Sequence, residues 1–374
     1  MKLSQVLEVL RALAPERLAE PWDAAGLQIG SAEQTVTRGM LCIDLTEPVL
    51  DEAITKQADL VVAYHPPIFK PLPALTDADA KQRIALRAAR AGMAIYSPHT
   101  ALDAVADGVN DWLASGIGEG DVRPIRPTAH DTAHLFKLVA FVPEHVADHL
   151  RAALSQAGAG VIGYYTECSF NLKGEGTFRG DETTSPAVGA AERFERVPEL
   201  RMEMVLPAAR LSEAVHVLHE EHPYEEPAFD VYPLHDVAAA TTPATQGQGR
   251  VVELKRPVQL PTLVRRLKQH LSVKHLEVAR SANKSESVRR VGLCAGAGGS
   301  LLAEAGDVDV FITGEMRHHD LLAALAQGVA VVLAGHTQTE RPYLPIYRDR
   351  ILAAGGADIP WLISKMDRPP STIR

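Results

Sequence analysis

The sequence is poor in cysteine, in aromatic residues and in net positive charge. Its three cysteines, Cys42, Cys168 and Cys294, lie far apart with no CxxC spacing, which favours a reducing compartment. Aromatic residues make up 5% of the 374 residues, and 38 Lys and Arg stand against 47 Asp and Glu, a formal net charge of −9. Because that charge repels phosphate backbones and anionic lipids, nonspecific binding to nucleic acid or to membrane surfaces is disfavoured.

Long hydrophobic runs are also missing. No apolar stretch approaches the roughly 18 residues that a membrane span requires. The amino terminus, MKLSQVLEVLRAL, places Leu3, Val6, Leu7 and Leu10 at helical spacing but interrupts them with Glu8, which indicates an amphipathic helix rather than a signal peptide. We therefore predict a cytoplasmic protein with no membrane segment. Its length suggests two or three domains.

Strand and helix patterns alternate at both ends of the chain, in residues 38–113 and from about residue 288 onward. Short apolar runs separated by helical patterns are typical of βαβ units and a mostly parallel sheet. The middle of the chain differs, because it repeats a strand, proline, helix, strand order twice, as a ferredoxin-like α+β module does. Polar stretches at 123–132 and 238–249 flank this module and resemble linkers in composition.

These patterns predict an α/β fold in which the two chain halves, residues 1–128 and 248–374, form one discontinuous domain. Residues 129–247 are then an inserted ferredoxin-like α+β domain. Within it, residues 171–189 are rich in Gly and Thr and are expected to form a long loop. Loops of that length commonly act as lids or binding loops, so both a lid over a site and a sensor arm stay open.

Polar side chains stand at the carboxyl ends of five predicted strands, where open α/β sheets bind ligands. They are Asp44, Tyr64 with His65, His99, Glu315 and His336.

Two of these positions share a local pattern, His99-Thr-Ala-Leu-Asp103 and His336-Thr-Gln-Thr-Glu340. On a helical turn, a His and a carboxylate four residues apart share one face and can bind the same ion. Imidazole and carboxylate ligands without thiolates suit zinc, iron or manganese and disfavour a structural zinc finger.

Other motifs point less clearly to chemistry. The turn GAGGS at 296–300 lacks the lysine of a Walker motif, so a tight structural turn is the better interpretation than a phosphate site. No GxSxG elbow occurs, which leaves nucleophilic serine catalysis without support. His318 and His319 fit a solvated helix face and a role near a substrate about equally well. The segment HEEHPYEEPAFD at 219–230 is better explained as a charged helix end and turn than as a cation site.

Five motifs in combination resemble the Nif-three-like dinuclear-metal family, whose members are commonly named GTP cyclohydrolase 1 type 2 homologues. They are PWDAAGLQIGS at 21–31, AYHPPIF at 63–69, YSPHTALDAVADGVNDWLA at 96–114, DVFITGEMRHHD at 309–320 and AGHTQTE at 334–340. The segment HPYEEPAFDVYPL looks like part of the PII/CutA-like insert of longer members. The resemblance implies a homohexamer with a two-metal site. It also implies a set of metal ligands, with Glu340 as the bridging one: His65, Asp103, His336 and Glu340.

One position departs from the pattern of many members, which have His-His-Pro where this chain has Tyr64, His65 and Pro66. A phenol with an ordinary pKa of about 10 binds metal well only as phenolate. The first metal is therefore expected to bind more weakly, to shift onto His99, or to be absent. We count Tyr64 and His99 among the candidate ligands and expect one or two divalent ions per chain, of zinc, iron or manganese.

Two functions follow. The first is a metal-dependent hydrolase with a metal-activated water as nucleophile, in which His99, Glu315 or His319 moves protons. The resemblance implies a nucleotide substrate such as GTP, and a phosphoester or another small molecule fits the same residues. The alternative is a non-catalytic metal sensor or regulatory scaffold that uses the PII-like insert. Turnover that depends on His336 and Glu340 distinguishes the two.

Overall fold

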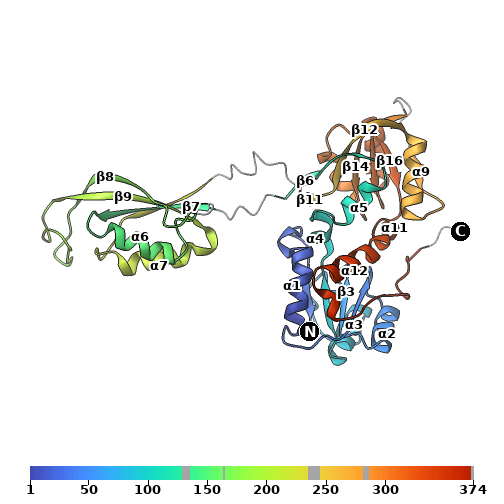
Figure 1. Ribbon diagram of the computed structural model, residues 1–374, viewed down its shortest axis with the longest axis horizontal. Coiled ribbons are helices and arrows are strands. Elements are labelled where there is room, and N and C mark those ends of the chain that lie inside the picture. Colours follow the sequence, from blue (N-terminus) through green and yellow to red (C-terminus); the bar gives the residue numbers. More distant parts are fainter. Residues whose placement is uncertain (129–134, 163–164, 235–244, 281–285, 372–374) are drawn as a thin grey trace. The chain divides into compact units, whose positions relative to one another are not determined.

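The computed structural model describes residues 1–128, 135–162, 165–234, 245–280 and 286–371. The chain divides into two compact units (Figure 1). Unit 1 comprises Met1–Thr128 and Ala244–Arg374, and unit 2 comprises Ala129–Pro243. Each unit has a hydrophobic core of its own.

The first sheet of unit 1 has five strands in the order β1-β4-β3-β2-β17, of which only β1 runs antiparallel to its neighbour. The strands are β1 (Gly26–Ile29), β2 (Gly39–Cys42), β3 (Leu60–Ala63), β4 (Ala94–Ser97) and β17 (Trp361–Ile363). Every residue of β2, β3 and β4 is buried, as in a parallel sheet that is covered on both faces.

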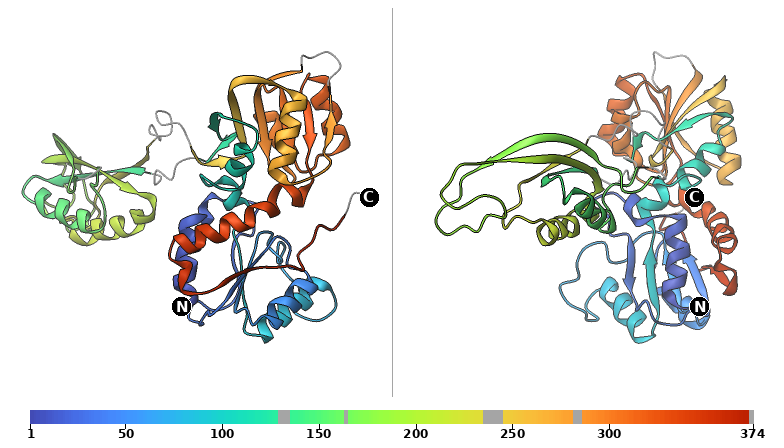
Figure 2. Two further views of the ribbon diagram at one scale, coloured as in Figure 1. Left: turned by 45° about the vertical axis from the view of Figure 1, so that its right-hand side comes forward. Right: turned by 60° about the vertical axis from the view of Figure 1, so that its left-hand side comes forward.

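Helices cover both faces of this sheet (Figure 2). On one face, α2 (Glu47–Thr55) and α3 (Ala80–Arg90) pack against Met40, Val61 and Ile95. On the other face, α1 (Leu3–Leu13) and α12 (Leu344–Ala353) contribute to the main core of the unit. The predicted amphipathic helix at the amino terminus is α1, and it buries Leu3, Val6, Leu7 and Leu10.

The second sheet of unit 1 has six strands in the order β13-β16-β15-β14-β12-β5, and β14, β15 and β16 are parallel. The strands are β5 (Gly120–Arg123), β12 (Arg250–Gln259), β13 (Glu277–Ala279), β14 (Ser287–Cys294), β15 (Val310–Thr313) and β16 (Ala330–Leu333). A small ribbon pairs β6 (Arg126–Pro127) with β11 (Gly247–Gln248).

The remaining helical segments of unit 1 connect these strands. They are α4 (His99–Ala104), α5 (Val109–Ser115), α9 (Leu260–Leu271), α10 (His318–Ala326), α11 (His336–Glu340) and the short 3-10 helices η1 (Glu16–Leu18), η3 (Gly298–Glu304), η4 (Arg341–Tyr343) and η5 (Gly356–Asp358).

Within unit 1, each half of the chain adds one strand to the sheet that is formed mainly by the other half. Strand β17, near the carboxyl terminus, pairs with β2 of the first sheet, and β5, from the amino-terminal half, pairs with β12 of the second. A buried ion pair adds to this connection, because Nη2 of Arg250 lies 3.0 Å from Oδ2 of Asp111 and the Arg250 side chain is 1% exposed. Neither half can complete its sheet alone.

Unit 2 has one antiparallel sheet in the order β10-β7-β9-β8, with two helices on one face (Figure 1). Its elements are β7 (Leu135–Pro143), α6 (Ala147–Gln156), β8 (Phe170–Phe178), β9 (Glu195–Pro207), η2 (Ala208–Arg210), α7 (Leu211–Glu221) and β10 (Phe229–Pro233). Leu138, Ala140 and Val142 of β7 pack against Leu150 and Leu218 of the two helices.

The prediction of a mixed α/β fold is confirmed, with several sheets. Two local predictions were wrong. The expected loop at 171–189 begins with most of strand β8, because this Gly-rich stretch obtains its backbone hydrogen bonds from β9. The expected linkers also contain strand residues, at β6 and β11, and their positions 129–132 and 238–244 fall outside the described residues. Among the helices of the described ranges, none has the length and apolar character needed to cross a membrane.

Candidate metal centre

Three residues of unit 1 converge to form a candidate metal site. His65 follows β3, whereas His336 begins α11 and Glu340 ends it. One ligand atom of each lies within 4.8 Å of the other two. Nε2 of His336 is 3.1 Å from Oε1 of Glu340, Nε2 of His65 is 3.6 Å from Oε2, and the two Nε2 atoms are 3.4 Å apart. Two imidazoles and one carboxylate form a ligand set that zinc sites use.

The surroundings of Glu340 fit a cation. Its side chain is 3% exposed, and Oε2 has no hydrogen-bond partner within the described part of the chain. A buried carboxylate oxygen without a partner is unfavourable unless an ion or a water supplies the missing interaction. Space is kept free beside it by Gly296, whose φ is +62°: a Cβ there would lie 2.4 Å from Oε1 of Glu340 and 3.2 Å from Nε2 of His336.

The carboxylates hold protons on both histidines when no cation is present. Burial lowers the pKa of His65, but the neighbouring carboxylates of Asp44 and Glu340 dominate and raise that pKa to about 10. The hydrogen bond to Glu340 raises the pKa of His336 to about 9. Burial acts to raise the pKa of Glu340, yet the two imidazoles leave it below its ordinary value. The cluster thus favours positive charge at its centre, as two protons or as a cation.

Two outer carboxylates orient the imidazoles. Oδ1 of Asp44 lies 2.9 Å from Nδ1 of His65, and Oε1 of Glu315 lies 3.1 Å from Nδ1 of His336. Metal-binding histidines commonly donate their second ring N–H to such a carboxylate, which fixes the tautomer and directs the other nitrogen to the ion. Glu315, predicted to move protons, is therefore placed to hold His336.

Tyr64 and Asp103 contact each other instead of joining the three ligands. The Tyr64 hydroxyl donates a short hydrogen bond to Oδ1 of Asp103. Burial raises the pKa of Tyr64 well above its ordinary value, so the group stays a phenol. Burial also raises the pKa of Asp103, to about 6. Both residues line the same cavity as the triad, but the metal-ligand grouping found among the described residues consists of His65, His336 and Glu340.

His99 is held by a carboxylate that sequence reasoning did not single out. Its Nδ1 lies 2.6 Å from Oδ1 of Asp23, a fully buried side chain that also accepts hydrogen bonds from the backbone N–H groups of Ala24 and Thr100. Because Nδ1 donates to Asp23, Nε2 of His99 carries the free lone pair. His99 has a φ of +33°, an uncommon conformation for a residue with a side chain, and its ring centroid is 5.5 Å from that of His65.

The triad lines a cavity of about 980 Å³ within unit 1 together with Asp44, Tyr64, His99, Asp103 and Glu315, and this volume is typical of small-molecule sites. Its wall combines the triad and its neighbours with aromatic and cationic side chains. The lining residues include Tyr64, His65, His99, Asp103, Glu315, His336, Glu340, Trp22, Phe69, Lys81 and Arg368.

Of two further sequence candidates, His319 lies outside this wall and the turn at 296–300 borders it as a structural element. His319 is exposed at the start of α10 and does not line the cavity. The turn at 296–300 does border it, but the N–H of Gly296 donates to Oγ1 of Thr339 at 2.9 Å and that of Gly298 to Oγ1 of Thr313 at 3.0 Å. These amides are therefore not available to a phosphate, as expected for a tight structural turn.

Comparisons with known proteins find similar chains over nearly the whole length. Residues 1–370 match the model of the Duf34/NIF3 family (NGG1p interacting factor 3). The GTP cyclohydrolase 1 type 2 homolog of Halalkalibacterium halodurans is 36% identical over 333 residues, which cover 88% of this chain and 87% of that protein. NIF3-like protein 1 of Rattus norvegicus is 32% identical over 381 residues and is covered to 93% of its length. A solved Bacillus cereus protein related to NIF3 superposes with a TM-score of 0.72 at 31% identity, over 100% of this chain and 99% of that one.

Proposed function

The chain belongs to the Duf34/NIF3 family, and we propose that it is a divalent-metal-binding protein that hydrolyses a nucleotide or a related small molecule. The observation that carries this proposal is the convergence of His65, His336 and Glu340 in the wall of a cavity of about 980 Å³. GTP is the first substrate to test because relatives carry the name GTP cyclohydrolase 1 type 2 homolog.

The residues of the site have three different roles in this proposal. His65, His336 and Glu340 hold the ion, and Asp44 and Glu315 hold the two histidines in place. A divalent ion bound there supplies Lewis-acid chemistry for hydrolysis. His99, with Nδ1 fixed by Asp23, accepts and returns a proton through Nε2.

We propose one ion per chain, of zinc, iron or manganese. A second ion needs Asp103, and that carboxylate already accepts the hydroxyl of Tyr64. The high pKa of Tyr64 opposes the phenolate that would be needed to bind metal. This contact also favours the second candidate function, a metal-binding sensor without turnover, because a single ion lacks the partner that a two-metal mechanism uses.

Unit 2 is proposed to be the ferredoxin-like, PII/CutA-like insert. In support, its elements follow the order β7, α6, β8, β9, α7, β10 with an antiparallel β10-β7-β9-β8 sheet. A homohexamer in the cytoplasm remains the proposed assembly and location.

Metal content and turnover test the proposal together. The protein is purified without chelators or a metal-binding tag, its ions are counted per chain, and GTP and other nucleotides are screened for hydrolysis. We expect about one ion per chain, lost together with turnover in His336→Ala and Glu340→Gln. The matched control is His216→Ala, an exposed histidine of α7 in unit 2, which should retain both.

Each other outcome is informative. Full metal content in His336→Ala and Glu340→Gln contradicts the site. A protein that binds its ion through this triad but hydrolyses no nucleotide supports the sensor instead. Two ions per chain would show that Tyr64 is compatible with a dinuclear centre.

A further inference from the structure

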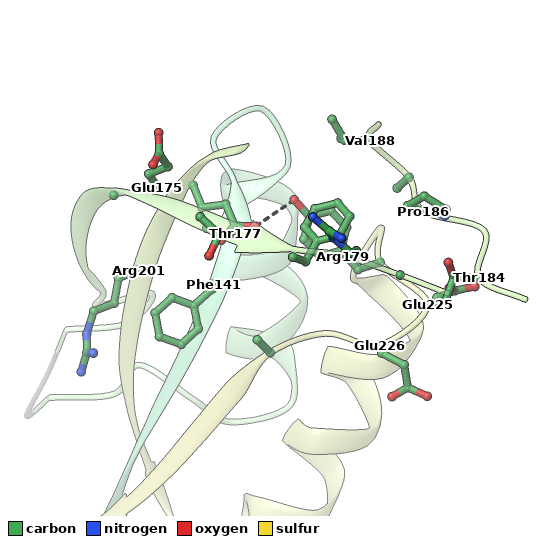
Figure 3. A pocket seen from close by; sticks show the side chains of 18 of the residues that line it. Phe141, Glu175, Thr177, Arg179, Thr184, Pro186, Val188, Arg201, Glu225 and Glu226 are labelled. Carbon is green, nitrogen blue, oxygen red and sulfur yellow. Dashed lines mark hydrogen bonds between the residues drawn. The ribbon is translucent and has the colours of Figure 1, made fainter. Parts of the chain in front are cut away.

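Unit 2 contains a second cavity, of about 660 Å³, that the proposed function does not use (Figure 3). It lies on the face of the sheet opposite α6 and α7. Successive strand residues point to opposite faces, so Leu200 and Met202 of β9 pack in the core beneath the helices while Arg201 between them lines the cavity. Phe141, the partner of Arg201 on β7, lines it too.

Two aromatic rings, of Phe141 and Tyr224, form part of this wall, and a buried histidine fixes them relative to each other. Nε2 of His222 lies 3.0 Å from the carbonyl oxygen of Phe141, and Nδ1 accepts the N–H of Tyr224 at 3.1 Å. These bonds require a neutral imidazole, and burial lowers the pKa of His222 accordingly. The segment at 219–230 thus builds an aromatic wall, and within the described residues it forms no metal-ligand cluster.

The polar groups beside the rings already have partners of their own. The Tyr224 hydroxyl donates to Oε1 of Glu199 at 2.9 Å. The guanidinium of Arg201 lies 5.8 Å from the centroid of the Phe141 ring and is held by Glu203 at 3.0 Å. Arg201 is therefore already neutralised by Glu203, whereas the neutral Tyr224 hydroxyl leaves the negative charge of Glu199 in place.

A loop after β8 forms the opposite wall, with Pro186 and Val188 facing the cavity. It is tied down because Oε1 of Glu225 accepts the N–H of Ser185 at 3.1 Å. Arg179, directly after β8, lines the cavity together with Phe141 and Pro186 (Figure 3). Across the described ranges of the chain, Arg179 has no ion pair, so its guanidinium is available to an anion.

We propose that this cavity binds a small aromatic anion. The planar ring of the ligand packs against Phe141 and Tyr224, and its carboxylate, sulfonate or phosphate pairs with Arg179. The volume lies within the range of about 300–1,000 Å³ that small-molecule sites occupy. Aromatic rings prefer offset or edge contacts with other rings, and the planar guanidinium binds oxyanions in a bidentate way. No residue of the metal centre takes part.

Two dyes with the same ring skeleton test this directly with the full-length chain. One is 8-anilinonaphthalene-1-sulfonate, and the other is N-phenyl-1-naphthylamine, which lacks the sulfonate. Their fluorescence is titrated with wild-type protein and with variants. We expect saturable binding of the sulfonate, about ten-fold tighter than that of the neutral dye, since a charge-assisted hydrogen bond adds affinity of this order.

Substitution of Arg179 is the decisive variant. Arg179→Ala should weaken the sulfonate about ten-fold and leave the neutral dye unchanged, because only the charge partner is removed. Arg210→Ala, an exposed arginine of unit 2 paired with Glu213, is the matched control and should change neither. The proposal is overturned if both dyes bind wild-type protein equally, if Arg179→Ala has no effect, or if His336→Ala abolishes binding, which would assign the dye to the cavity of unit 1.

Discussion

The two cavities of this molecule are built in different ways. In unit 1 the ligand residues follow strands of parallel sheets, so segments far apart in sequence meet at one place, as His65 and His336 do. In unit 2 the cavity lies on one face of an antiparallel sheet and is lined by alternate residues of neighbouring strands, such as Phe141 and Arg201. A site at strand ends leaves a pattern in the sequence, whereas a site on a sheet face depends on strand register and on what covers the other face.

The difference extends to charge. In unit 1 the buried Glu340 has an oxygen without a hydrogen bond among the described residues, whereas in unit 2 Arg201 is paired with Glu203 and Glu199 accepts the Tyr224 hydroxyl. Changes in one unit should therefore leave the ligand of the other unaffected, and variants of each can test that separation.

The largest expected effect concerns the link between the two halves of unit 1. Arg250→Met removes a buried guanidinium that binds Asp111 and the carbonyl oxygens of Gly247, Gly249 and Val105. The loss should cost about 3 kcal/mol or more, since Asp111 loses its charge partner and buried carbonyl oxygens lose their donor.

Hydrogen exchange measured by mass spectrometry should report this loss in β12 and α5, while β7 and β9 of unit 2 keep their protection. Arg289→Met is the control, because Arg289 is exposed and its pair with Glu253 contributes little. Equal loss of protection in both units would show that they unfold together and would contradict the independence of the two units.

The second prediction concerns the space beside the metal ligands. Gly296→Ala places a methyl group 2.4 Å from Oε1 of Glu340 and forces a side chain into a backbone with φ of +62°. We expect metal affinity to fall about 100-fold, because ligands that are displaced or misoriented bind the ion more weakly. Dye binding in unit 2 should be unchanged. Competition with a fluorescent chelator measures the affinity.

Gly299→Ala in the same turn is the matched control, because its methyl would meet only the side chain of Met316, at 3.2 Å. A Gly296→Ala protein with wild-type affinity would mean that the ion does not sit beside this glycine.

The sequence predicted the part of the candidate metal site that follows a local rule. His65 stands after a strand, and His336 and Glu340 are spaced for one helical face, so all three were found without a structure. Asp23 was missed because it lies in an irregular segment 76 positions before its partner His99, and only the fold joins them.

Contacts between elements far apart in the sequence explain the other failures. The pairing of Tyr64 with Asp103 and the strand β8 depend on neighbours that a linear pattern does not show. Glycines at 174 and 176 suggest a loop by composition, yet β9 supplies the hydrogen bonds of a strand. In addition, a side chain at Gly176 would meet the carboxylate of Glu199, so the same glycine opens the cavity wall.

The smallest predicted effect concerns the hydrogen bond that holds Tyr224 in the cavity wall of unit 2. Tyr224→Phe keeps the ring but removes the hydroxyl that donates to Glu199. The free energy of unfolding should fall by about 1 kcal/mol, the typical net value of one hydrogen bond, and the affinity for the anilinonaphthalene sulfonate should change less than three-fold, since ring contact and Arg179 remain. Chemical denaturation and dye titration measure the two quantities. Hydrogen bonds through Phe141 and His222 hold the backbone around position 224, so the substitution should not move the ring. A large loss of dye binding would therefore mean that the Tyr224 hydroxyl contacts the ligand directly.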